Sequence, residues 1–181
     1  LMEMLRKSSV SDTLKLCFEF TVLTAARSGE ARGALKSEID FNTKMWVIPD
    51  NRMKMDKAHS APLSDRAIEV LRKAFALAPE SALVFPNLNS DQPLSDQAFT
   101  KVVLRENLKV PYTAHGFRST FRTWAGEKTT YPREVCELAL AHNIMDKVEE
   151  AYARTTFVEQ RRHLMQDWAN YLRDTASPAA S

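Results

Sequence analysis

Helical periodicity runs along most of this chain and breaks down in one region, between residues 38 and 64. Three short stretches there, EIDFN, KMWVIPD and AHSAPLS, have the residue patterns of strands, and the polar segment NRMKMDK separates the last two. We therefore expect three short strands, with a turn between the second and the third. The break predicts a mainly α-helical fold that contains one small three-stranded antiparallel β-sheet.

The remaining periodic segments predict helices. Residues 11–26 have the pattern of an apolar helix with Ser11 or Asp12 as its N-cap, and SGEARGAL follows as a short second helix. The segment 83–93 has the turn chemistry of a loop. We expect the further helices at residues 63–78, 94–107, 113–128, 132–142, 146–155 and 158–174.

The bulk composition is that of a globular protein, with 44% apolar and 27% charged residues among 181. We expect one domain over residues 1–175 and a disordered tail over residues 176–181. Cys17 and Cys136 lack CxxC spacing and lie in apolar helical patterns, which favours buried free thiols in a reducing compartment. No apolar run reaches the roughly 18 residues of a membrane-spanning helix, so we expect no membrane partner.

Five segments carry polar residues that stand out from their surroundings. Arg27 directly follows an apolar helix in TAARSGEARG, and Glu30, three residues on, could hold its guanidinium. HGFRSTFRTWA places His115 and Arg118 on one helical face, with Arg122 one turn further. The others are Lys54 and Lys57 in MKMDKAHSAPLS, His142 at the end of LALAHN, and Tyr152 in EEAYARTTF. Taken alone, each has an ordinary explanation as a solvated charge, a helix cap or a packed ring.

Several kinds of site are disfavoured by the sequence. The four histidines show no HExxH pattern and no carboxylate at ligand spacing, so we expect no metal. Four glycines and no GxxxxGK[ST] motif exclude a glycine-rich phosphate loop, and a hydrolase elbow of the GxSxG kind is absent. The net charge of +2 is too small to identify a nucleic-acid binder, so any such function must come from local clustering.

The order of the five segments is more informative than any one of them. They run Arg…Lys…His-x-x-Arg…His…Tyr, and this resembles the tyrosine recombinase family, the phage-type integrases, and within it the subgroup carried by prophages and genomic islands. The resemblance covers roughly residues 10–172. It implies a DNA breaking-rejoining catalytic domain with the catalytic residues Arg27, Lys54, His115, Arg118, His142 and Tyr152.

Spacing chooses between neighbouring candidates within this resemblance. The family's lysine lies eight residues before the proline of a strand, and Lys54 has that spacing to Pro62, whereas Lys57 does not. Tyr152 lies ten residues after His142, in a segment that matches the family's nucleophile segment. We interpret Arg122 as a packing residue or a backbone contact. Family members also carry an arm-binding and a core-binding domain ahead of the catalytic domain, and we expect both to be absent from this chain.

The chemistry of DNA cleavage explains why these residue types are required. Two arginines can hold the non-bridging oxygens of a phosphodiester with forked, charge-assisted hydrogen bonds. A tyrosine can form a covalent link to the DNA that conserves bond energy, so that the strand is rejoined without ATP. Lys54 resembles the family's general acid for the departing 5′ oxygen, His115 could accept the tyrosine proton or hold the phosphate, and His142 would donate to a non-bridging oxygen.

The resemblance implies a site-specific recombinase that integrates or excises a mobile element through a 3′-phosphotyrosine intermediate, without metal or other cofactor. Its partners would be double-stranded DNA at attachment sites, three further copies in a tetramer, a DNA-bending host factor and an excisionase. The expected location is the bacterial cytoplasm, in association with the nucleoid. Two alternatives stay open at this point: a nicking-closing activity like that of type IB topoisomerases, and a DNA-binding module without catalysis.

Overall fold

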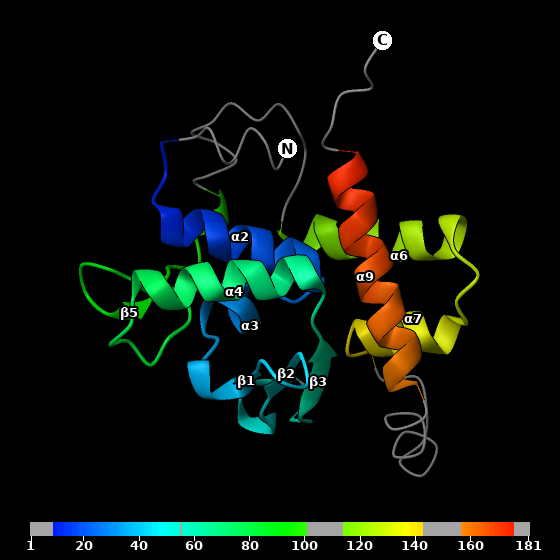
Figure 1. The fold of residues 1–181 in the computed structure, drawn as a ribbon, viewed down its shortest axis with the longest axis horizontal. Coiled ribbons are helices and arrows are strands. Elements are labelled where there is room, and N and C mark those ends of the chain that lie inside the picture. Colours follow the sequence, from blue (N-terminus) through cyan, green and yellow to red (C-terminus); the bar gives the residue numbers. More distant parts are fainter. Residues whose placement is uncertain (1–8, 55, 101–113, 143–156, 176–181) are drawn as a thin grey trace.

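The computed structural model describes residues 9–54, 56–100, 114–142 and 157–175 of the chain. Figure 1 shows two groups of helices, one around α2 and α4, which lie side by side, and one made by α6, α7 and α9. The small sheet lies against the first group. The described helices are α2 (Asp12–Thr24), α3 (Ser28–Arg32), α4 (Asp65–Leu77), α6 (Ala114–Lys128), α7 (Arg133–Ala139) and α9 (Val158–Asp174), with the 3₁₀ turns η1 (Lys36–Glu38) and η2 (Asp50–Arg52).

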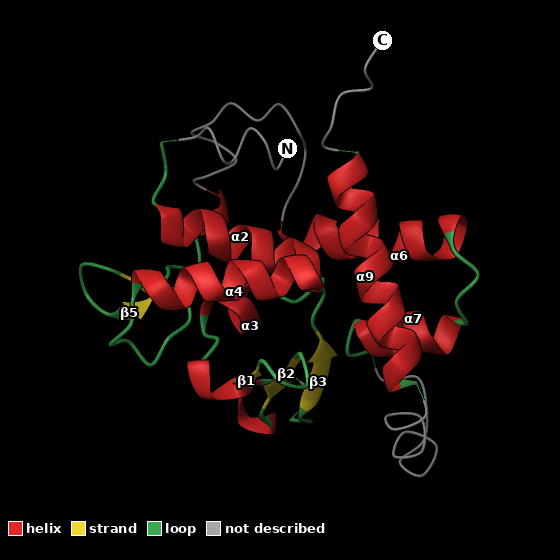
Figure 2. Cartoon of the chain, in the orientation of Figure 1, coloured by secondary structure: helices red, strands yellow, loops and turns green. Residues whose placement is uncertain are grey.

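The sheet has the expected three strands in antiparallel order. They are β1 (Ile39–Asp40), β2 (Met45–Ile48) and β3 (His59–Pro62), and Figure 2 shows them as a small unit among helices. Trp46 of β2 pairs with Ile39 on one side and Ala61 on the other. Its ring is fully buried, and its Nε1 donates to Glu38 Oε2 at 2.9 Å. The mainly helical fold with one small antiparallel sheet is therefore confirmed.

Two local expectations need correction. The segment 83–93, expected to be a loop, contains a second hairpin of β4 (Pro86–Asn87) and β5 (Gln92–Pro93). Its turn is closed by the carbonyl of Asn87, which accepts from the amides of Ser90 and Asp91, and Asp91 takes the left-handed conformation at φ 49°. The expected helix at 94–107 begins at residue 98, and its part after residue 100 lies outside the described residues, as does the helix expected at 146–155.

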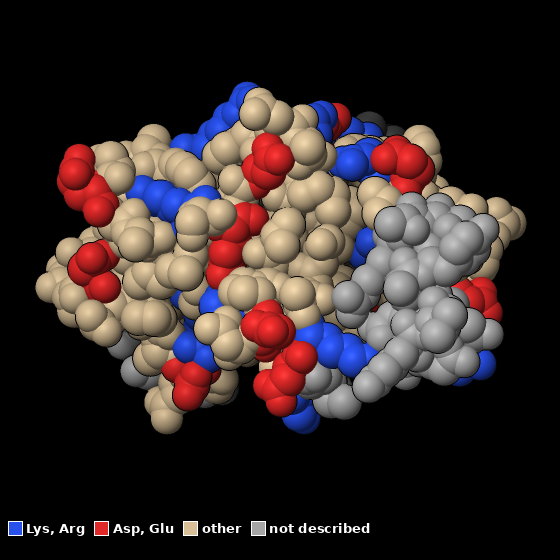
Figure 3. Space-filling view, turned by 90° about the horizontal axis from the view of Figure 1, so that it is seen from below, with Lys and Arg blue, Asp and Glu red and all other residues tan. Residues whose placement is uncertain are grey.

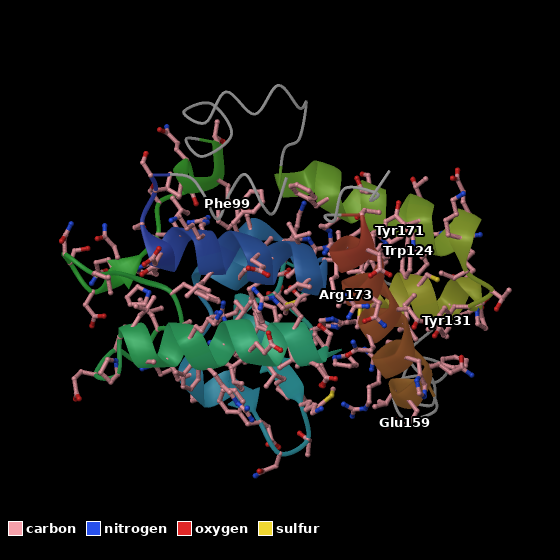
Figure 4. The ribbon with its side chains drawn as sticks, turned by 45° about the horizontal axis from the view of Figure 1, so that its top comes forward. Phe99, Trp124, Tyr131, Glu159, Tyr171 and Arg173 are labelled. Atoms are coloured by element: carbon pink, nitrogen blue, oxygen red, sulfur yellow. The ribbon has the colours of Figure 1, made fainter. Side chains whose placement is uncertain are left out.

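Helix α9 contributes side chains to the hydrophobic core. Leu164, Met165 and Trp168 are buried, and the indole Nε1 of Trp168 donates to the carbonyl of Val22 in α2 at 2.8 Å. Further along α9, the exposed Tyr171 lies against Trp124 of α6, with ring centroids 5.6 Å apart (Figure 4). The apolar face of α9 is thus used mainly within this chain.

The two cysteines are buried free thiols, as expected. Burial raises the pKa of the Cys17 thiol far above its ordinary range, so this group stays a neutral part of the core. Of the helices within the described ranges, none combines the length and the apolar character needed to cross a membrane.

Replacing Ser64 with alanine should lower the free energy of unfolding by about 1 kcal/mol. Ser64 is the N-cap of α4, and its hydroxyl accepts from the amide of Ala67 at 3.3 Å, a bond that alanine cannot make. Urea denaturation of both proteins measures the difference. The matched control is Ser119→Ala at an exposed position of α6, which should change stability by less than about 0.5 kcal/mol. Equal effects of the two substitutions would contradict the capping role.

Candidate functional site

The end of α2 and the start of α3 position Arg27. Ala25 adopts the left-handed conformation as the C-cap of α2, at φ 49° and ψ 27°, and turns the chain so that Arg27 becomes the N-cap of α3. Glu30 holds Arg27 twice: Oε2 accepts from the backbone amide at 2.9 Å and Oε1 accepts from Nη1 at 2.7 Å. The expected contact between these two residues is confirmed. Glu30 is buried while the Arg27 side chain is 29% exposed, so the guanidinium is fixed but can be reached from solvent.

The guanidinium of Arg118 hydrogen-bonds to the C-terminal ends of two other helices, α2 and α7. It projects from α6 and is only 6% exposed. Its Nη1 donates to the carbonyl of Ala25 at 2.6 Å, and its Nη2 donates to the carbonyl of Leu140, just after α7, at 2.6 Å. Both acceptors are carbonyls at helix C-termini, where the helix dipole favours a positive charge. A planar guanidinium with several donors suits this bridging position.

The end of α7 positions His142. Ala141 takes the left-handed conformation at φ 52°, its amide donates to the carbonyl of Leu138, and the amide of His142 donates to the carbonyl of Glu137. These two bonds make a Schellman motif, which stops the helix before His142 rather than at it. The imidazole Nε2 then lies 3.3 Å from Nη2 of Arg118, and Nδ1 lies 2.6 Å from Oε2 of Glu137.

The electrostatics of this site favour an anion. Burial, together with the positive charge of Arg27 and against the negative charge of Glu30, lowers the pKa of Arg118 to about 10. Two guanidiniums are thus held near each other in a partly desolvated place, with a histidine beside them. A phosphate would satisfy their remaining donors and offset their mutual repulsion. On the face shown in Figure 3, basic and acidic side chains are interspersed over the described part.

Lys54 lies on the turn between β2 and β3 and is exposed. Among the described residues, no hydrogen bond or ion pair joins Lys54 directly to Arg27, Arg118 or His142. An indirect link exists through Arg52, whose Nη2 donates to the carbonyl of Glu30 at 2.6 Å. The turn that carries Lys54 is therefore anchored beside α3, the helix that Arg27 caps, through a contact made two residues before the lysine.

Two predicted site residues cannot be placed by their side chains. His115 lies in the first turn of α6, three residues before Arg118, and its side chain is outside the described part. Tyr152 lies outside the described residues altogether. The structure thus brings together Arg27, Arg118 and His142, and the catalytic roles assigned to all six residues remain predictions.

Glu137 is a residue of this site that the sequence did not predict. Its Oε1 accepts from Nε of Arg122 at 2.6 Å while its Oε2 contacts His142, so the carboxylate bridges α6 and the end of α7. Arg122, interpreted as a packing residue or a backbone contact, makes an ion pair instead. A separation of five residues does not place Glu137 and His142 on one helical face, and only the left-handed turn at Ala141 brings them together.

No group of three or more histidine, cysteine or carboxylate side chains is arranged as a metal site within the described ranges. The groups that meet at this site are guanidiniums, an imidazole and backbone carbonyls. They can bind an anion, orient it and donate hydrogen bonds to it.

Comparison with known proteins identifies relatives of this chain. The family model described as "Phage integrase family" matches residues 1–159 of this chain. Prophage integrase IntA of Escherichia coli K12 is 37% identical over 174 residues, which are 96% of this chain and 42% of that protein. The chain thus spans about two fifths of the length of the curated relatives it matches.

Two solved structures share the fold. The XerH site-specific recombinase bound to difH substrate, in a pre-cleavage complex, has a TM-score of 0.63 and 21% identity over 84% of this chain and 50% of that one. A lambda integrase dimer bound to a COC′ core site has a TM-score of 0.60 and 18% identity over 83% of this chain and 55% of that one. At this identity the likeness shows the fold alone. The family match covers most of the chain and IntA exceeds 30% identity across nearly all of it, so the chain belongs to the phage integrase family.

Proposed function

We propose that residues 1–175 form the catalytic domain of a site-specific DNA recombinase, which cleaves and rejoins DNA through a covalent 3′-phosphotyrosine and so integrates or excises a mobile element. The observation that carries this proposal is the buried Arg118, held against His142 and close to Arg27 in a member of the phage integrase family. A site of this charge and shape suits one phosphodiester of a DNA strand.

The two arginines act on the charge of the transition state. Arg27 and Arg118 bind the non-bridging oxygens, on which negative charge accumulates as the tyrosine oxygen attacks phosphorus. Because Glu30 and two backbone carbonyls already fix the two guanidiniums, they need little reorganisation when DNA binds. His142 donates to one of the same oxygens, and His115, one turn before Arg118, accepts the tyrosine proton or holds the phosphate.

Tyr152 is the proposed nucleophile, and the described tyrosines suit that task poorly. The hydroxyl of Tyr131, labelled in Figure 4, donates to Asp167 at 2.7 Å. Burial and the carboxylate of Asp167 raise the pKa of Tyr131 to about 12, which makes its phenolate harder to form. Tyr171 is stacked on Trp168, with ring centroids 5.7 Å apart. Attack by Tyr152 displaces the 5′ oxygen, which takes a proton from Lys54.

The proposed substrates and partners follow from the family. The substrates are two attachment sites in double-stranded DNA, and four copies of the protein assemble on them. A DNA-bending host factor and an excisionase are the further partners, and the protein acts on DNA in the nucleoid of a bacterial cytoplasm. XerH and lambda integrase were solved bound to DNA sites, which supports DNA as the partner of this chain.

A nicked DNA substrate that releases a short fragment on cleavage, and so cannot be rejoined, tests the proposal. The unmodified protein should form a covalent adduct that survives denaturing electrophoresis, and Tyr152→Phe should form none, because it lacks the attacking oxygen. The control is Tyr171→Phe, which keeps its ring and should still form the adduct. An adduct in the Tyr152→Phe protein would show that another residue attacks.

A further inference from the structure

A carboxylate outside the predicted set of site residues contacts the imidazole of His142. Glu137 is buried, and each of its oxygens has one partner: Nε of Arg122 lies 2.6 Å from Oε1, and Nδ1 of His142 lies 2.6 Å from Oε2. Burial alone would raise the pKa of Glu137, but the hydrogen bonds from His142 and Arg122 outweigh it and hold this pKa below its usual value. The group is therefore an anion at neutral pH.

An anionic acceptor at Nδ1 decides where the imidazole carries its proton. Because a carboxylate can only accept, Nδ1 must be the protonated nitrogen of neutral His142, and Nε2 is then free to accept from Arg118. When the imidazole is fully protonated, both nitrogens are donors, and the carboxylate compensates the added charge. Nε2 and the Arg118 guanidinium can then donate together to one phosphate oxygen.

We propose that Glu137 is a positioning residue for DNA cleavage: it fixes the ring of His142 with Nε2 beside Arg118 and provides the counter-charge for the imidazolium that donates to the phosphate. This inference rests on the proposed function, since it requires that His142 contacts the scissile phosphate. Within the described part of the chain, the Glu137 carboxylate hydrogen-bonds to His142 and Arg122, so it acts through the histidine.

The other charged groups around His142 do not replace this carboxylate. Arg118 lies at Nε2, and the charge of Arg27 acts on Arg118, so these two neighbours are cations and neither can be a counter-charge for an imidazolium. Glu30 is occupied by Arg27. On α9, which packs against α7, Asp167 accepts from Tyr131. Glu137 is thus the carboxylate that contacts the ring among the described residues.

The test measures single-turnover cleavage against pH on a substrate whose bridging 5′ oxygen is replaced by sulfur. A thiolate leaves without a general acid, so the alkaline fall of the rate no longer reports on the proton donor of the leaving group. Glu137→Gln keeps the size of the side chain and removes its charge. In this variant, the pH at which the rate declines on the alkaline side should be about one unit lower than in the unmodified protein, because the protonated imidazole loses its counter-charge.

Two further variants separate positioning from a structural role. Glu134→Gln removes the same charge from an exposed position on the same helix, and should leave the alkaline fall where it is. Arg122→Gln frees the carboxylate from its competing cation, and should leave the fall in place or move it to higher pH. A purely structural role predicts the same response to Glu137→Gln and Arg122→Gln, since each breaks the same ion pair.

The outcomes are distinct. An unmoved profile in folded Glu137→Gln, or a fall at lower pH in Arg122→Gln, would overturn the positioning role while leaving the recombinase proposal intact. Absence of a covalent adduct in the unmodified protein would instead overturn the proposed function. Circular dichroism establishes whether each variant is folded. If Glu137→Gln is not folded, the Arg122→Gln profile alone tests the positioning role: a decline at lower pH overturns it, and a decline at the same or a higher pH supports it.

Discussion

Replacing Arg118 with lysine should slow DNA cleavage by on the order of 10²–10³-fold. The guanidinium donates to the carbonyls of Ala25 and Leu140 and contacts His142, while its remaining donors are available for a phosphate. An ammonium keeps the charge but cannot bridge two carbonyls and bind a phosphate in one plane. The rate should therefore fall although the net charge is unchanged.

Single-turnover formation of the covalent adduct measures this effect. The control is Arg66→Lys, which alters another partly buried arginine. Arg66 lies on α4, a helix that carries none of the predicted site residues, and its Nε donates to Glu19 at 2.7 Å. Arg66→Lys should cleave at nearly the unmodified rate. A folded Arg118→Lys protein with the same rate as Arg66→Lys would show that charge alone matters at position 118.

Much of the fold could be predicted because local and tertiary preferences agree. The sheet was visible as a change of period, and the caps at Ser11 and Ser64 mark the starts of α2 and α4. The hairpin of β4 and β5 was missed because each strand has two residues, too few to show a period. The end of α7 was placed too late because Ala141 gives no composition signal for a left-handed turn.

The site was predictable only where a family pattern or a helical spacing marked its residues. Glu30 could be linked to Arg27 because a separation of three residues brings side chains together at a helix start. Glu137 carried no such signal, since its contact with His142 depends on the backbone conformation of one intervening residue. The two carbonyls that accept from Arg118 belong to different helix ends, and such a meeting exists only in the folded chain.

Replacing Lys54 with alanine should slow cleavage of ordinary DNA by on the order of 10²–10⁴-fold. The leaving 5′ oxygen departs as a strongly basic alkoxide unless a proton reaches it in the transition state. Lys54 is exposed on a turn, and Arg52, two residues earlier, anchors that turn through Glu38 and the carbonyl of Glu30. The turn that carries Lys54 is thus anchored to α3, the helix that Arg27 caps, and the exposed lysine side chain could reach bound DNA from it.

A substrate with sulfur in place of the bridging 5′ oxygen separates acid catalysis from charge stabilisation. A thiolate leaves at neutral pH without a proton, so Lys54→Ala should recover most of its lost rate on this substrate. Arg27→Ala should stay slow on both substrates, because Arg27 is proposed to bind the non-bridging oxygens, which the sulfur does not change. Lys57→Ala, at a half-buried neighbouring position, should be close to the unmodified protein on both. If Lys54→Ala gains nothing from the sulfur, Lys54 binds the phosphate rather than protonating the leaving group; if Lys57→Ala is rescued instead, the spacing to Pro62 has identified the wrong lysine.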